Sequence, residues 1–139
     1  MSEQDKALMR RFFDEVLNAH NPDAAANFCA PDIVDHNPYP EQPAGIEGTK
    51  RALGQLVAAF PDLHCSIETV VSDGDRVVAY YRFTGTQKGD FMGFPASGKK
   101  VDVAAFDMVR VVDGKAKERW GIFEEMVMAT QLGMVPDMP

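Results

Sequence analysis

The spacing of apolar residues changes at Pro61, and this change limits the folds that are open to the chain. Before Pro61, apolar residues recur every three or four positions, for example at Leu8, Phe12 and Val16, which is typical of amphipathic helices. The helices predicted in this half are Asp5–His20, Asp23–Phe28 and Gly45–Phe60. The stretch 32–43 contains several prolines, so it is predicted to be a brief strand or an extended loop.

After Pro61, apolar residues alternate or run continuously, and β-branched residues are enriched. The predicted strands are Leu63–Ser72, Arg76–Gln87, Lys99–Val112 and Lys115–Glu124, followed by a short helix over Glu125–Leu132. The pairs Asp73-Gly74 and Asp113-Gly114 are hairpin signals, so the strands should form an antiparallel meander. Helices followed by strands predict an α+β fold, a cone-shaped half-barrel whose curved sheet wraps around the helices and leaves a cavity.

Composition limits the partners that this fold can take. A length of 139 residues fits one domain, residues 1–139, and a net charge of −7 argues against binding to nucleic acid or to an anionic membrane. The chain shows no signal peptide or membrane span, which predicts a soluble, cytoplasmic protein. Cys29 and Cys65 have no metal or redox spacing. Composition therefore favours a small neutral or weakly polar ligand, and the sequence has no P-loop, dinucleotide-binding motif or zinc-ligand spacing.

Hairpin geometry predicts which side chains face the cavity. If Val112 pairs with Lys115 across the turn at Asp113-Gly114, the residues that follow pair in a fixed order. The predicted pairs are Asp107 with Trp120, Ala105 with Ile122, and Val103 with Glu124. This face is otherwise apolar and is predicted to point inward. The other face carries charged residues, including Arg119, and is predicted to meet solvent or another subunit.

Two carboxyl groups, Asp107 and Glu124, are candidate general acids or bases on the predicted inner face. Burial among apolar residues raises the pKa of a carboxyl group toward neutrality, where it transfers protons well. The structural alternatives are a Glu124 that reaches water at the sheet rim and an Asp107 bonded to a backbone amide or a basic side chain. His36, between Asp35 and Asn37, either carries a proton or bonds to backbone.

Aromatic residues are candidates for the cavity wall. Phe12, Phe60, Tyr81, Phe91, Phe94 and Trp120 either line an apolar pocket or fill the core. Phe91 and Phe94 lie in a glycine-rich loop after Gln87, where they would cover the mouth of the cone or pack across a dimer contact.

Five ordered motifs carry a resemblance to a known family. GIEGTKRAL at 45–53, AFPDL at 59–63, TGTQKGDFMGFPASGKKV at 84–101, VDGKAKERW at 112–120 and QLG at 131–133 are similar to the SnoaL-like polyketide cyclases. The resemblance implies the cone of the nuclear transport factor 2-like superfamily, usually a homodimer formed through the sheet. It also implies a small apolar or carbonyl-containing ligand and an aldol cyclisation without metal or cofactor.

The resemblance also implies roles for single residues. The family's acid/base carboxyl follows the tryptophan of the last strand, which implies Glu124 here. The histidine that relatives carry after TGT is Gln87, which is therefore expected near the substrate, and His36 is the remaining candidate imidazole. The function expected is proton transfer in a cyclisation, isomerisation or hydration. The alternative is a ligand-binding protein that has lost the chemistry.

Overall fold

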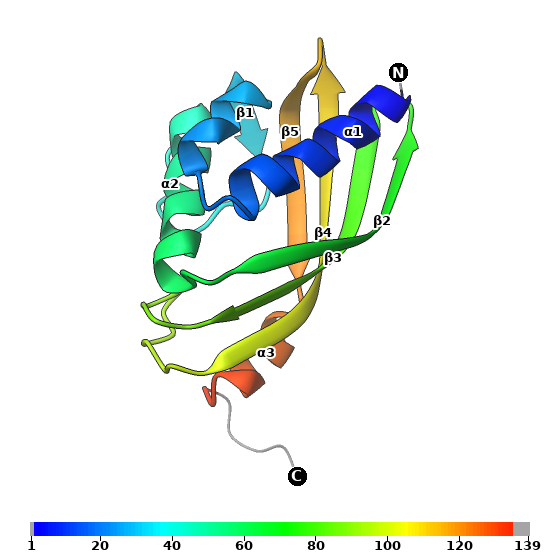
Figure 1. Cartoon of the computed structure of the whole chain (residues 1–139). Coiled ribbons are helices and arrows are strands. Elements are labelled where there is room, and N and C mark those ends of the chain that lie inside the picture. Colours follow the sequence, from blue (N-terminus) through cyan, green and yellow to red (C-terminus); the bar gives the residue numbers. More distant parts are fainter. Residues whose placement is uncertain (1, 135–139) are drawn as a thin grey trace.

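Helices from the first sixty residues lie across one face of an open, bent β-sheet (Figure 1). The computed structural model describes residues 2–134. The helical elements are α1 (Ser2–Phe12), a π-helical turn (Phe13–Leu17), a 3-10 helix (Pro22–Asn27), α2 (Gly45–Ala59) and α3 (Glu125–Gln131). The strands are β1 (Cys29–Asp35), β2 (His64–Asp73), β3 (Arg76–Thr86), β4 (Lys100–Val112) and β5 (Lys115–Phe123).

The sheet has the strand order β1-β5-β4-β3-β2, and its edges β1 and β2 do not pair with each other. Strands β2 to β5 pair antiparallel in sequence order, as the two Asp-Gly signals predict. The start of the proline-rich stretch becomes β1, which pairs parallel with β5 and makes the sheet mixed. An edge strand tolerates Pro31 because one side of its backbone needs no partner. The predicted α+β arrangement is confirmed.

A π-helical turn, Phe13–Leu17, continues α1 and buries Phe13, Val16 and Leu17. The amide of Asn18 donates to the carbonyl of Phe13, five residues earlier, at 2.8 Å. A π turn holds more residues than an α turn, so the side chains that follow it shift around the helix. Phe13 meets the Tyr81 ring with centroids 4.7 Å apart, and Phe12 meets Phe28 at 5.9 Å.

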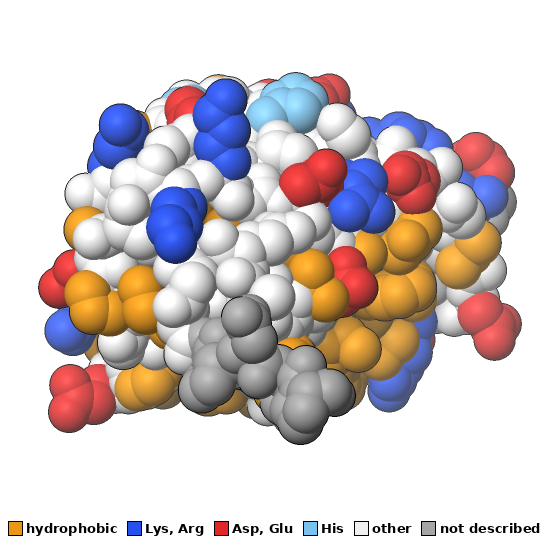
Figure 2. Space-filling view, turned by 90° about the horizontal axis from the view of Figure 1, so that it is seen from below, with side chains coloured by type: hydrophobic (Ala, Val, Ile, Leu, Met, Phe, Trp, Pro, Cys, Tyr) orange, Lys and Arg blue, Asp and Glu red, His pale blue; other side chains and the backbone are white. Residues whose placement is uncertain are grey.

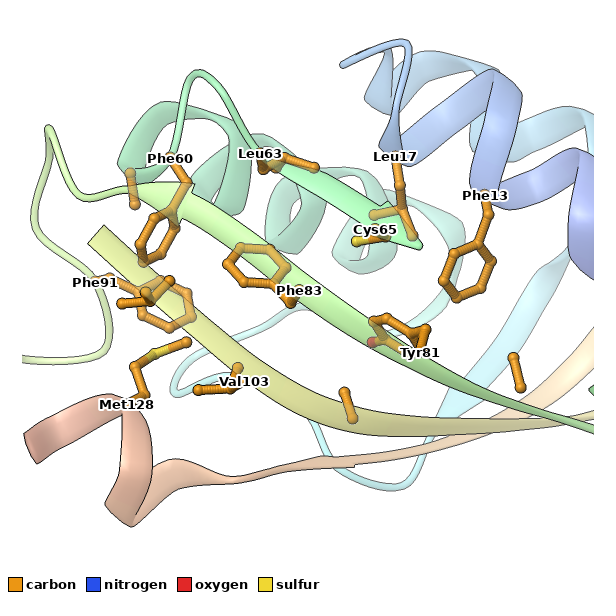
Figure 3. Packing of buried hydrophobic residues seen from close by; sticks show 14 of the residues in the cluster. Phe13, Leu17, Phe60, Leu63, Cys65, Tyr81, Phe83, Phe91, Val103 and Met128 are labelled. Atoms are coloured by element: carbon orange, nitrogen blue, oxygen red, sulfur yellow. The ribbon is translucent and has the colours of Figure 1, made fainter. Parts of the chain in front are cut away.

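The core lies between α1, α2 and the inner face of the sheet (Figure 3). The residue that follows α2, Phe60, is completely buried. Its ring makes edge contacts with Phe83 at 5.2 Å and with Phe91 at 5.3 Å. Burying aromatic rings of this size is among the largest contributions that single side chains make to stability.

The register between β4 and β5 differs from the predicted one because of a β-bulge. Val112 pairs with Lys115 as expected, and Asp113 and Gly114 form the turn with φ of 51° and 74°. The register then shifts: Val111 pairs with Ala116 and Arg110 with Glu118, so that Lys117 is an extra residue. The pairs beyond the bulge are Asp107 with Gly121, Met108 with Trp120, Phe106 with Ile122, and Ala105 with Phe123.

The inward placement predicted for Trp120 and Glu124 is therefore wrong, and Ile122 turns to the outer side, where it is 65% exposed although it still borders the cavity. Because side chains alternate between the two faces of a strand, one extra residue moves each later side chain to the opposite face. Arg119 and Gly121 face inward instead, beside Asp107.

Candidate active site

A cavity of about 370 Å³ lies between the helices and the inner face of the sheet. Phe12 of α1 and Leu53 of α2 line it on the helical side, and Tyr81 and Ala105 line it on the sheet side. Phe91 lines it from the loop between β3 and β4. Its size falls within the range of small-molecule pockets, and most of its lining is apolar.

The polar part of the cavity wall is an Asp-Arg-Asp cluster on three strands. Arg119 of β5 donates from Nη2 to Asp107 Oδ1 of β4 at 3.1 Å. From Nη1 it donates to both oxygens of Asp35, the last residue of β1, at 3.2 and 3.3 Å. The side chains of Asp107 and Asp35 are only 14% and 13% exposed, and that of Arg119 is 29% exposed. One guanidinium thus holds two largely buried carboxyl groups.

The segment after β1 fixes Asp35 in this position. The His36 amide donates to the carbonyl of Arg119 at 2.8 Å, and the Gly121 amide donates to Asn37 Oδ1 at 3.0 Å. The Asn37 amide in turn donates to Asp35 Oδ1 at 3.0 Å. These bonds fasten the end of β1 to β5, so Asp35 and Arg119 stay side by side.

Gly121 makes room for the cluster. It pairs with Asp107 across β4 and β5, and a Cβ placed on it would overlap the guanidinium of Arg119. The same Cβ would lie 2.6 Å from Asp107 Oδ1. Any larger residue at this position would displace the guanidinium, and only glycine avoids this.

Burial and charge set the protonation of the cluster. Burial raises the pKa of Asp107, while Arg119 and the Tyr81 hydroxyl oppose that rise by stabilising the carboxylate. Burial works against the positive charge of Arg119, but Asp107 and Asp35 outweigh it and raise the pKa of Arg119, which remains a cation. Burial also raises the pKa of Tyr39 to about 12 and that of Tyr81 well above its usual value. The site thus offers a carboxyl group of raised proton affinity and two neutral phenols.

Several residues predicted for the site lie in the cavity wall, and others do not. Phe12, Tyr81, Phe91 and Asp107 line the cavity. Phe60 packs behind Phe91 in the core, Phe94 is half-buried at the turn of the loop, and Gln87 is buried beneath that loop. His36, Glu124 and Trp120 are not among the lining residues.

These last three residues have structural partners outside the cavity. His36 stacks on Trp120 with centroids 4.4 Å apart and planes 6° apart, and its Nε2 lies 3.0 Å from Glu118 Oε1. Glu124 is exposed, and its carboxylate accepts the Ala104 amide proton at 2.7 Å. That position at the end of β5 matches the rim placement considered as the structural alternative.

Sequence reasoning missed Arg119, Asp35, Tyr39 and Gly121 as site residues. For Asp35 the sequence held a usable signal, because Ile33 lies two positions earlier and residues two apart share a face of a strand. Ile33 is 4% exposed, so Asp35 follows it inward. Arg119 and Gly121 depend on the bulge at Lys117, for which the sequence contains no local signal.

Residues 2–134 contain neither a candidate membrane span nor a candidate metal-binding cluster. No helix there is long and apolar enough to cross a membrane. That part of the chain also contains no group of three or more His, Cys, Asp or Glu side chains that could hold a metal ion.

The fold and sequence are similar to those of known proteins. TsrD from Streptomyces laurentii is 28% identical, with a TM-score of 0.88 over 96% of this chain and 97% of that one. A candidate SnoaL-like polyketide cyclase from Jannaschia sp. CCS1 is 28% identical, with a TM-score of 0.86 over 97% and 95%. A SnoaL-like polyketide cyclase from Agrobacterium tumefaciens strain C58 is 25% identical, with a TM-score of 0.77 over 91% and 95%.

No curated protein matches the chain in sequence. The family model of the SnoaL-like polyketide cyclases, however, matches residues 7–132, nearly the whole length of the chain. The motifs at 45–53, 59–63, 84–101 and 112–120 lie inside the matched region. The chain therefore belongs to the SnoaL-like polyketide cyclase family.

Proposed function

We propose that the chain is a cyclase-type catalyst that moves a proton beside a carbonyl group of a small molecule, with Asp107 as the general acid/base. The observation that carries the proposal is the position of Asp107, a carboxyl group of raised pKa on the wall of an apolar cavity. Such a carboxyl group is suited to taking and returning a proton near neutral pH. The reaction types that fit this proposal are an aldol cyclisation, an isomerisation and a hydration.

The reaction begins with Asp107 in its ionised form. Its carboxylate removes a proton from the carbon next to the carbonyl group, and negative charge develops on the carbonyl oxygen. Tyr39 and Tyr81 are neutral hydroxyl donors close to Asp107, and a hydrogen bond from either stabilises that oxygen. The protonated Asp107 then returns the proton to the new carbon or oxygen centre, so no net proton is consumed.

Arg119 and Asp35 position the acid/base. Arg119 donates to Asp107 through one nitrogen and to Asp35 through another, so the guanidinium fixes the direction of the Asp107 carboxyl group. Asp35 shares the positive charge and prevents Arg119 from holding Asp107 permanently ionised. Neither residue needs to exchange a proton itself.

Proton transfer can be tested before the natural substrate is known. A panel of β-keto esters in deuterated water would report deuterium uptake at the α-carbon by mass spectrometry. Asp107→Asn should slow uptake about a hundredfold or more, the usual contribution of a general base. Glu124→Gln, the matched carboxyl-to-amide control at the rim, should stay within about threefold of wild type. The reverse pattern would assign the role to Glu124 and reject Asp107.

A non-catalytic ligand-binding protein is the second candidate function. It is supported by the ion pair itself, because Arg119 engages one oxygen of Asp107 and reduces its basicity. In that case the panel compounds would bind in the cavity, and wild-type protein would show no more deuterium uptake than Asp107→Asn.

We also propose that two copies of the chain associate through the outer face of the sheet. Phe106 and Ile122 pair across β4 and β5 on that face and are 46% and 65% exposed. Large exposed apolar groups side by side are typical of protein interfaces. Ile122→Lys should convert a dimer to a monomer in sedimentation velocity. A monomeric wild type would contradict the proposal.

The end of the molecule that carries α3 also exposes hydrophobic side chains, as Figure 2 shows from below. Met126 of α3 is 68% exposed, and Met92 of the loop before β4, which lines the cavity, is 41% exposed. These exposed apolar side chains favour this end as the mouth of the cavity, where an apolar substrate would first contact the protein.

A further inference from the structure

Gln87, directly after β3, is completely buried, which is uncommon for a glutamine. Both ends of its side-chain amide have partners. Nε2 donates to the carbonyl of Phe94 at 2.9 Å. Oε1 accepts from the Ser97 hydroxyl at 2.7 Å and from the Ser97 amide at 3.2 Å. A buried amide needs such partners, because leaving it unpaired is costly.

These bonds cross the interior of the loop 88–99, while the backbone of Gln87 closes its base. The Gln87 amide donates to the carbonyl of Lys99 at 2.9 Å, and the Gly98 amide donates to the carbonyl of Gln87 at 2.8 Å. At the start of the loop, the Lys88 amide donates to the carbonyl of Ala59, the last residue of α2, at 2.8 Å. The Gln87 side chain is therefore the internal support of a loop that has no regular secondary structure beyond one short turn.

The supported turn carries part of the cavity wall. Phe91 and Phe94 exchange backbone hydrogen bonds of 3.0 and 2.8 Å around Met92 and Gly93, which have φ of 48° and 86°. This tight turn presents Phe91 to the cavity. The Phe91 ring lies 5.3 Å from that of Phe60 and 5.7 Å from that of Tyr39, and Figure 3 shows it pointing from the loop into the core.

From this chain of contacts we infer that Gln87 is a positioning residue for ligand binding: its amide fixes the Phe91–Phe94 turn and thereby places Phe91 in the cavity wall. Gln87 itself does not line the cavity and does not touch the ligand. The role requires a donor toward Phe94 and an acceptor toward Ser97 at the same time. Glutamine has both, whereas an ionised glutamate has only acceptors.

This requirement gives a test that depends on protonation. Gln87→Glu keeps the shape of the side chain, but its carboxylate faces the Phe94 carbonyl without a proton. When protonated, the carboxyl group can again donate to Phe94 and accept from Ser97. A buried carboxyl group takes up its proton at a higher pH than an exposed one, so protonation is expected as the pH falls from about 8 to about 5.

The probe is prodan, an uncharged fluorescent ketone, and each variant is compared with wild type at the same pH. At about pH 8, Gln87→Glu should bind prodan about tenfold more weakly, and the amides of 91–97 should exchange hydrogen about a hundredfold faster. At about pH 5, both should return to within about twofold of wild type. Gln87→Met, which fills the space without hydrogen bonds, should be impaired at both values.

Thr86→Val is the matched control. Thr86 adjoins Gln87, but its hydroxyl binds Asp62 and not the loop. This variant should bind prodan like wild type and leave exchange in 91–97 unchanged.

Wild-type binding and exchange in Gln87→Glu at both pH values would overturn the inference. If Gln87→Glu is not folded at about pH 8, Ser97→Ala provides the test instead. This change removes the hydroxyl that donates to Gln87 Oε1, and Ser97 is only half-buried, so the variant should fold. Unchanged loop exchange in Ser97→Ala would then overturn it. The inference rests on one part of the proposed function, namely that a ligand binds in the cavity. It does not require proton transfer by Asp107, so prodan binding and deuterium uptake can fail independently.

Discussion

Replacing Gly121 with alanine should destabilise the protein, although the same change in most strands stabilises them. Glycine in a strand interior usually costs about 0.5–1 kcal/mol of stability relative to alanine, so the protein would become more stable if the added methyl group met no other atoms. Here the added Cβ overlaps the Arg119 guanidinium and comes within 2.6 Å of Asp107 Oδ1. The guanidinium must move, and the contact of 3.1 Å between Arg119 and Asp107 is lost.

The magnitude follows from the burial of the pair. Removing one partner from a fully buried ion pair costs about 3–5 kcal/mol. Asp107 keeps 14% of its side chain exposed and can take up a proton, and Arg119 can retain Asp35, so we expect a net loss of about 2–3 kcal/mol. For 139 residues, an unfolding entropy of about 0.3 kcal/mol/K converts this loss to a fall in Tm of about 7–10 °C.

The loss should also depend on pH. Burial raises the pKa of Asp107 above its value in the unfolded chain, so the folded state keeps a proton that the unfolded state has released. Stability contributed by this group is complete below the unfolded pKa and falls as the pH rises toward the folded one. Loss of Arg119 raises the folded pKa further. Gly121→Ala should therefore be closer to wild type at about pH 4 than at about pH 8.

Thermal melts followed by circular dichroism at both pH values would measure these effects. Gly54→Ala is the matched control, because a Cβ on Gly54 of α2 meets nothing within 4 Å. That variant should gain up to about 1 kcal/mol from helix propensity. A Gly121→Ala variant as stable as wild type, or equally destabilised at both pH values, would refute the steric and electrostatic account of the cluster.

Three other perturbations test separate parts of the structure. Burial raises the pKa of Cys29 to about 11 and that of Cys65 to about 12, so at about pH 8 iodoacetamide should alkylate either thiol at least about two-hundredfold more slowly than free cysteine until the protein is unfolded. Trp120→Ala removes the stack on His36 and should lower stability by about 1 kcal/mol while leaving prodan binding in the cavity unchanged. Phe60→Ala should cost about 3–5 kcal/mol in urea titrations, because the ring is completely buried.

The features of the fold that sequence reasoning predicted are those that local patterns encode. Helical spacing before Pro61, alternation after it and the turn at Asp113-Gly114 were sufficient for the order of the elements and for strand ends within a few residues. The pairing of β1 with β5 joins Cys29 to Ala116, far apart in the sequence, and no local pattern specifies such a contact. The proline-rich stretch could therefore be identified as extended but not assigned a partner.

The candidate site was predicted only in part, for a related reason. Asp107, Phe12 and Tyr81 follow from alternation or helical spacing within one element, Phe91 follows from its place in the glycine-rich loop, and all four line the cavity. Gln87 was identified from the family resemblance, because it stands where relatives carry a histidine after TGT, but its hydrogen bonds to Phe94 and Ser97 depend on a loop conformation that spacing does not determine.

The misplacement of Arg119 shows how one residue of register decides the chemistry of the cavity. Lys117, Glu118 and Arg119 are consecutive charged residues, so either register of β5 turns at least one charge inward. Without the bulge, Glu118 would face inward near Asp107 and Asp35, which would put three carboxyl groups in the cavity without a cation.

With the bulge, Arg119 takes that place and bonds to both aspartates, while Glu118 pairs with Arg110 and His36 on the outer face. Arg119 thus compensates the two carboxyl groups that already lie in the cavity, and a third carboxyl group is kept out of it. The partners that favour this register come from β1, β4 and β5 together. The hairpin of β4 and β5 alone does not contain Asp35, so its own sequence cannot show why the bulged register is the better one.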